Sequence, residues 1–117
     1  TLSRVTELQK RAAKVGFDWD DVKPVVDKVK EELTECLEAG EGEVETELGD
    51  LLFAVVNLAR FMQIDAEQAL RRAGRKFAVR FDKMKKKAES EGLDFQQLTL
   101  EQKEQLWQTV KQEEARV

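Results

Sequence analysis

The strongest constraint on the fold is the helical spacing of apolar residues, in a chain with one proline and six glycines. Leu2, Val5, Leu8 and Ala12, for example, recur every three or four residues, as one face of an α-helix requires. Several glycines stand between such segments, where helices commonly end. This pattern predicts no strand and five helices, over residues 2–15, 22–39, 44–62 and 66–91, and then a short one that carries Leu106, Trp107 and Val110.

These segments predict a single all-α domain over residues 1–117, built as a bundle of four to five helices. The length of 117 residues suits one domain. In the third helix, the run from Leu51 to Val56 is apolar on nearly every face, and such a helix is buried on most sides. A chain of this size has little material to cover it alone. We therefore predict a homodimer that packs around the third helix.

The composition excludes several classes of site. The chain has no histidine and one cysteine, Cys36, so serine-type triads, Cys–His dyads and histidine-containing zinc sites lack their parts. There is no glycine-rich phosphate loop. The longest apolar stretch is too short to span a membrane, and no signal peptide is visible. A single cysteine suits a reducing compartment, and we expect a cytoplasmic protein without membrane contacts.

The net charge of −4 hides a segregation of charge along the chain. From Glu31 to Asp50 there are nine acidic residues and no basic one, whereas from Arg71 to Lys87 there are nine basic residues and one acidic one. Like charges held together destabilise a fold unless something compensates them. Two interpretations stay open: either the two blocks pair with each other or lie in water, or the first binds a cation and the second an anion.

Carboxylates lie at the border of the predicted core on two consecutive helices. On a helical wheel, Glu32 and Glu35 flank the apolar face of the second helix, and Glu47 and Asp50 flank that of the third, where Ala54 leaves room. If these flanks face each other on antiparallel neighbouring helices, four carboxylates converge, which raises pKa values unless a cation is present. The wheel assigns these apolar faces to Val22, Val26, Val29, Leu33 and Cys36, and to Leu48, Leu51, Val55, Leu58 and Met62.

Oxygen ligands without histidine or thiolate favour Mg²⁺ or Mn²⁺. Mg²⁺ bound by carboxylates keeps positions for water and for substrate phosphates, which the basic block could hold through Lys76 and Arg80, one turn apart. A solvated acidic face is the simpler alternative. A di-iron bundle normally needs Glu-x-x-His pairs, and an EF-hand loop needs a spacing that residues 18–21 lack.

The acidic residues also carry a family resemblance. Glu31-Glu32-Leu33-Thr34-Glu35, followed by Glu47-Leu48-Gly49-Asp50, resembles the EExxE…ExxD signature of the MazG-type nucleoside triphosphate pyrophosphohydrolases. The segments 9–19, 50–60 and 75–81 and the tail around Trp107 resemble the same family, so the likeness covers nearly the whole chain. It is strongest to the C-terminal module of two-module bacterial MazG proteins. Since the chain begins at Thr1, we expect it to be cut from a longer protein.

The resemblance implies a MazG-like all-α dimer that cleaves an NTP or dNTP to the monophosphate and pyrophosphate with Mg²⁺, or Mn²⁺ in its place. It implies metal ligation by Glu32, Glu35, Glu47 and Asp50, and catalytic roles for Glu31, Glu32 and Glu35. The substrate-binding residues it implies are Lys28, Lys76, Arg80, Trp107, Trp19 and Asn57.

Simpler roles stay open for several of these residues. Trp19 and Trp107 could pack, Asn57 could satisfy backbone groups, and Lys76 and Arg80 could belong to a salt-bridge network. For an acidic protein we expect no nucleic-acid partner. The alternative function is an inert helical dimerisation or regulatory module of a two-module protein. Two departures from the family bear on activity: Gly74, where members often carry Asn, and the short linker over residues 36–46.

Overall fold

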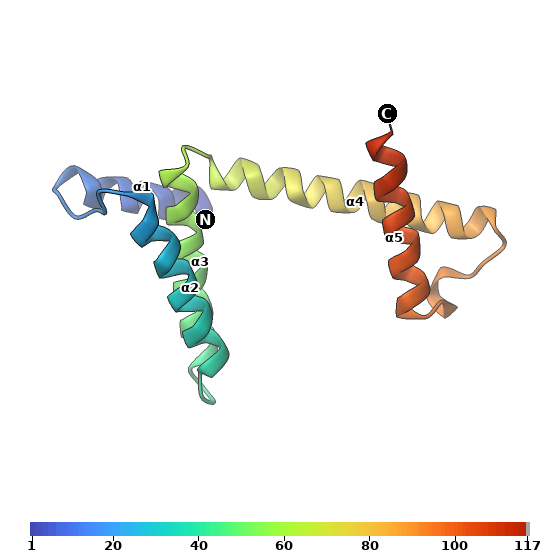
Figure 1. Cartoon of the computed structure of the whole chain (residues 1–117), viewed down its shortest axis with the longest axis horizontal. Helices are drawn as coiled ribbons and strands as arrows, with labels where there is room; N and C mark the ends of the chain where they lie inside the picture. The colour runs from blue at the N-terminus through green and yellow to red at the C-terminus, as the bar shows by residue number, and fades with distance from the viewer. Residues whose placement is uncertain (117) are drawn as a thin grey trace. The chain divides into compact units, whose positions relative to one another are not determined.

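The computed structural model describes residues 1–116, and its regular structure in that range is entirely helical (Figure 1). The elements are α1 (Leu2–Lys14), α2 (Val22–Glu38), α3 (Val44–Phe61), α4 (Ala66–Ser90), the 3₁₀ turn η1 (Phe95–Gln97) and α5 (Leu100–Ala115). The all-α prediction is confirmed, and the first four helices end within one residue of their predicted bounds. The fifth is longer than predicted, with 16 residues.

Two units divide the described chain, one formed by residues 1–70 and the other by the residues from 71 onward. The first turn of α4 belongs to the first unit and the rest of that helix to the second. Each unit is described by itself below. The prediction of a single domain over the whole chain stays a prediction.

The first unit is built on an antiparallel hairpin of α2 and α3, which lie side by side (Figure 1), with α1 packed against α3. Asp21 begins α2, because its Oδ1 atom accepts a 2.7 Å hydrogen bond from the backbone N–H of Val22. Gly42, at a φ of +84°, lets the chain turn tightly between the two helices. The hairpin therefore faces the acidic parts of α2 and α3 toward each other.

The buried face of this hairpin matches the one predicted on the wheel only in part. On α2, Val26, Val29 and Cys36 are half-buried as predicted. The fully buried residues of this helix are Val25 and Glu32, while Val22 and Leu33 are exposed. On α3 the buried residues are Ala54 and Val56. The wheel weighs only side-chain hydrophobicity, whereas the helices pack where small residues let their backbones approach. Large apolar side chains therefore remain exposed on a single chain, at Val22, Leu33, Leu37, Leu48, Leu52, Phe53, Val55 and Met62.

The second unit packs the C-terminal half of α4 against α5. Its core comprises Met84, Ala88, Leu106 and Val110. On α4 the rings of Phe77 and Phe81, one turn apart, stack with their centroids 5.9 Å apart. In the part of the chain that the structure describes, no helix has the length and apolar character needed to cross a membrane.

Candidate metal centre

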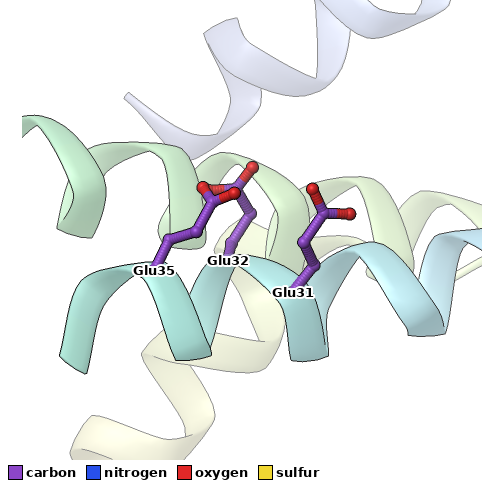
Figure 2. A group of neighbouring side chains, drawn as sticks. All are labelled: Glu31, Glu32 and Glu35. Carbon is purple, nitrogen blue, oxygen red and sulfur yellow. The ribbon is translucent and has the colours of Figure 1, made fainter. Parts of the chain in front are cut away.

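The hairpin of α2 and α3 gathers the acidic side chains into two overlapping groups. Glu32 of α2 meets Glu47 and Asp50 of α3, with one carboxylate oxygen of each within 4.8 Å of the others. Along α2, the carboxylates of Glu31, Glu32 and Glu35 also approach one another within 4.8 Å. Figure 2 shows these three side chains rising from α2 on the same side of the helix, with the carboxyl groups of Glu32 and Glu35 adjacent. Glu32 thus belongs to both groups.

Glu32 is the most buried of these carboxylates, with 8% of its side chain exposed. Its Oε1 atom lies 2.9 Å from Nζ of Lys28, one turn earlier on α2. The hydrogen bond from Lys28 holds the pKa of Glu32 below its usual value, and the same contact raises the pKa of Lys28. Lys28 also lies 3.5 Å from Glu31, so this lysine neutralises part of the acidic cluster.

Repulsion within the cluster acts most clearly on Glu35. Its pKa is raised, first by the hydrogen bond that it shares with Glu32 and then by repulsion from Glu32, by partial desolvation and by the charges of Glu47 and Glu31. Two carboxylates that share a proton stay close at neutral pH only at an energetic cost. This is the crowding that the sequence predicted for a site without its cation.

The donor atoms fit a hard divalent cation. Among the described residues, Oε2 of Glu32 and Oε2 of Glu47 are buried and have no hydrogen-bond partner. A buried polar atom without a partner is costly, and a carboxylate oxygen can be satisfied only by a donor or a cation. All the neighbouring ligand atoms are carboxylate oxygens, which suit Mg²⁺ or Mn²⁺.

A cleft of about 640 Å³ adjoins the carboxylates within the first unit. Glu32 and Lys28 line it from α2, and α3 lines it from Asp50 to Arg60. From Asp50 to Arg60 the helix rises by ten residue steps, or about 15 Å. The other lining residues come from α1, from the loop after it and from α3, and about half of them are apolar: Leu8, Gln9, Ala12, Gly16, Phe17, Asp18, Trp19, Phe53, Ala54 and Asn57. The cleft thus joins an anionic end to an apolar wall.

A hydrogen-bond network holds the loop after α1 against α3 at the far end of this cleft. The guanidinium of Arg60 donates to both carboxylate oxygens of Asp18, at 2.7 and 3.1 Å, and to Oδ1 of Asn57, at 2.8 and 3.0 Å. Arg60 holds the pKa of Asp18 below its usual value. Trp19 follows in the same loop, half-exposed at the cleft. Asn57 therefore supports Arg60 rather than the backbone.

Sequence reasoning singled out neither Asp18 nor Arg60. Both lie in segments that resemble the family, but 42 positions separate them and no local pattern pairs them. Gln9 was missed as well, although it is buried and lines the cleft. One glutamine on an amphipathic helix gives no signal of burial. Only the packing of α1 on α3 reveals it.

The remaining predicted substrate ligands belong to the second unit. Arg80 donates a 2.8 Å hydrogen bond to Glu114 of α5, and its guanidinium lies 5.6 Å from the centroid of the Trp107 ring. Lys76 is exposed on α4. At Gly74 an added Cβ would meet no atom within 4 Å, so the asparagine common in the family would find space there. Binding of substrate by Lys76, Arg80 and Trp107 stays a prediction.

Comparison with known proteins points to one family. A family model described as the MazG nucleotide pyrophosphohydrolase domain matches residues 20–85, which include all the clustered carboxylates and Lys28. The Thermotoga maritima protein named nucleoside triphosphate pyrophosphohydrolase/pyrophosphatase MazG is 46% identical over 111 residues, covering 94% of this chain and 44% of its own length.

Two further relatives extend the comparison. The nucleoside triphosphate pyrophosphohydrolase of Escherichia coli K12 is 44% identical over 119 residues, covering 97% of this chain and 45% of its own length. Bacillus subtilis YabN, named as uncharacterized, is 43% identical over 76 residues, which cover 65% of this chain and 16% of YabN. The chain thus spans less than half the length of the first two relatives.

Proposed function

Because the chain belongs to the MazG nucleotide pyrophosphohydrolase domain family, we propose that it hydrolyses nucleoside triphosphates to the monophosphate and pyrophosphate. The observation that carries this proposal is the meeting of Glu32, Glu47 and Asp50 beside a cleft with an apolar wall. Such a cleft offers one end for a charged triphosphate with its cation and another for a nucleoside.

In this proposal Glu32, Glu35, Glu47 and Asp50 hold Mg²⁺, with Mn²⁺ as a substitute. The buried, unpaired oxygens of Glu32 and Glu47 support this ligand set. When bound, the ion supplies positive charge against the phosphates and lowers the pKa of a coordinated water. Glu31 is the outer member of the cluster, with 57% of its side chain exposed and Lys28 beside it.

A carboxylate of the site would take up the proton that the reaction releases. Water adds to the α-phosphorus, the bond from that phosphorus to the bridging oxygen breaks, and pyrophosphate leaves. The water's proton passes to a carboxylate of the site. Glu32 and Glu35 are the candidates for this role, each through an oxygen that the ion leaves free, and the carboxylate of Glu31 lies within 4.8 Å of both.

Cationic and aromatic side chains would hold the rest of the substrate. Lys28 lines the cleft next to Glu32 and would contact a phosphate oxygen once its carboxylate partner binds a metal. Lys76 and Arg80 would add phosphate contacts, and Trp19 and Trp107 would lie near the nucleoside. Asn57 lines the cleft but already accepts from Arg60, so we give it the role of shaping that wall.

A homodimer in the cytoplasm completes the proposal. The exposed apolar side chains of α2 and α3, such as Leu37, Leu48 and Leu52, would be covered by a second copy. Sedimentation equilibrium should give twice the chain mass of 13.5 kDa. A Leu52→Lys variant should shift this mass toward the monomer, and a monomeric wild-type protein would contradict the dimer.

The direct test of function is incubation of the purified chain with each NTP and dNTP in the presence of Mg²⁺. Release of the monophosphate together with pyrophosphate is expected. Release of a diphosphate and inorganic phosphate would place the cleavage at the wrong bond. The absence of turnover, with no thermal stabilisation by Mg²⁺, would favour the inert module instead.

A further inference from the structure

Gln9 on α1 is a buried polar residue that the proposed reaction does not use. It is 6% exposed, and its Nε2 atom donates a 3.0 Å hydrogen bond to the backbone carbonyl of Phe53 on α3. That contact fixes the orientation of the side-chain amide, since the reverse orientation would set two oxygens against each other. The Oε1 atom of Gln9 is therefore an acceptor with a fixed position.

Within residues 1–116, this acceptor has no hydrogen-bond partner. Oε1 of Gln9 is buried, and no hydrogen-bond donor among the described residues reaches it. Gln9 lines the cleft beside Leu8, Ala12 and Ala54, whose side chains offer no hydrogen-bonding group. Buried acceptors are rarely left unpaired, so the atom calls for a donor that enters the cleft.

The position of Gln9 relates it to the expected substrate. Its anchor, Phe53, lies three residues after Asp50 on α3, or about 4.5 Å along the helix axis. A nucleotide with its phosphates at Asp50 and Glu32 would extend its nucleoside along α3 toward Asn57. The nucleoside would then pass the wall that Gln9 forms.

We propose that Gln9 is a specificity-determining residue, whose Oε1 atom accepts a hydrogen bond from an N–H or O–H group of the nucleoside. This inference rests on the proposed function. The shared chemistry is a single donor, which either the base or the sugar can supply. The residue would select substrates because an analogue without that donor leaves a buried acceptor unpaired.

The first test changes only the substrate and uses the wild-type protein. For the base, ATP is compared with purine riboside triphosphate, GTP with ITP, CTP with its analogue lacking the 4-amino group, and UTP with 3-methyl-UTP. For the sugar, ATP is compared with 2′-deoxy-ATP and 3′-deoxy-ATP. Loss of the donor that Gln9 recognises should lower kcat/KM by roughly tenfold or more. Equal kcat/KM values in every pair would overturn the proposal.

The second test uses Gln9→Met, which keeps the length of the side chain and removes both polar atoms. In this variant the discrimination found for the wild type should fall to within about twofold. Leu8→Met is the matched control, since it alters the same wall without removing an acceptor. This control should change kcat/KM by the same factor for every nucleotide and so keep the discrimination between them.

Two further results separate the possible failures. If Gln9→Met is folded by circular dichroism but discriminates like the wild type, Gln9 does not read the nucleoside, although the hydrolase function stands. If Gln9→Met does not fold, the substrate comparison on the wild type decides whether a donor of the nucleoside is recognised. If the wild type neither turns over nor binds any of these nucleotides by calorimetry, both proposals fail together.

Discussion

Nζ of Lys28 lies 2.9 Å from Oε1 of Glu32, so a lysine on the same helix already neutralises the most buried carboxylate of the cluster. This pair helps to explain how Glu32 can lie close to Glu47 and Asp50 without unfolding the hairpin. It also places a resident positive charge where a divalent ion would bind. Lys28 and the ion therefore compete for the same carboxylate.

Replacement of Lys28 by methionine should tighten Mg²⁺ binding and weaken catalysis. Without the lysine, Glu32 is free for the metal, and we expect the Mg²⁺ dissociation constant to fall by roughly three- to tenfold, the range for a partly screened ion pair. The loss of a phosphate contact should lower kcat/KM. Calorimetry with Mg²⁺ measures the first effect. Lys30→Met, on the exposed face of α2, is the control and should change neither value.

Removal of a single ligand charge should abolish turnover without unfolding the chain. Glu32→Gln and Asp50→Asn each keep the shape of the side chain but remove an anionic donor, and we expect at least a hundredfold lower kcat, on the order of 2.7 kcal/mol in activation free energy. Monophosphate release measures this. Glu38→Gln, at an exposed position of α2, should keep full activity.

Thermal melts of the same variants show whether the lost activity reflects a lost metal. For the wild type, Mg²⁺ at about 100 times its dissociation constant should add about 2.7 kcal/mol to the free energy of unfolding. Glu32→Gln should melt like the wild type without Mg²⁺ and gain little stability when Mg²⁺ is added. A full Mg²⁺ response in that variant would remove Glu32 from the ligand set.

Glu35 should make Mg²⁺ binding depend on pH. Its pKa in the metal-free fold is raised by Glu32, so at a pH near this raised value the fold holds a proton that an unfolded chain has already lost. The contribution of Glu35 to stability therefore increases as pH falls through its folded pKa. Mg²⁺ must displace that proton, and its affinity should rise with pH above the ordinary range of glutamate.

Calorimetric Mg²⁺ titrations in buffers of different ionisation enthalpy would count the protons released through Glu35. In Glu35→Gln the pH dependence and the proton release should both decrease. An unchanged pH profile in that variant would show that Glu35 does not carry the coupling.

The pair of Asp18 and Arg60 should stabilise the loop after α1 in a pH-dependent manner. We expect Asp18→Asn to lower the free energy of unfolding by about 1 kcal/mol. A bidentate, partly buried ion pair contributes more to stability than an exposed ion pair does. Arg60 lowers the pKa of Asp18, so this contribution is fully present above the ordinary value of 3.8 and is lost as pH falls through the folded value.

Denaturant unfolding of the wild type and of Asp18→Asn would test the pair of Asp18 and Arg60. The measurements would run from roughly pH 2 to pH 7, a range that includes the titration of aspartate. The two proteins should differ at neutral pH and converge in acid. Asp20→Asn, in the same exposed loop, should match the wild type throughout. A difference that persists at the lowest pH would point to a packing effect rather than to the ion pair.

Helix positions in this chain follow from local sequence. Asp21 accepts the first N–H of α2, and Thr99 and Gln102 form the capping box that begins α5, because caps depend on residues within one turn. The meeting of Glu32 with Glu47 and Asp50 was also predictable. Two helices joined by a short loop are antiparallel, and their border residues then face each other.

Contacts between distant residues needed the tertiary structure. Arg60 finds Asp18 across 42 positions, and Gln9 finds the carbonyl of Phe53 across 44, in both cases because α1 packs on α3. On α2, too, only the folded structure shows that Val25 is buried while Val22 is exposed. A sequence carries the period of each helix and the charge on each face. The rotation of one helix against another depends on how closely their backbones approach. Small residues such as Ala54 allow a close approach, but this effect appears only when both helices are in contact.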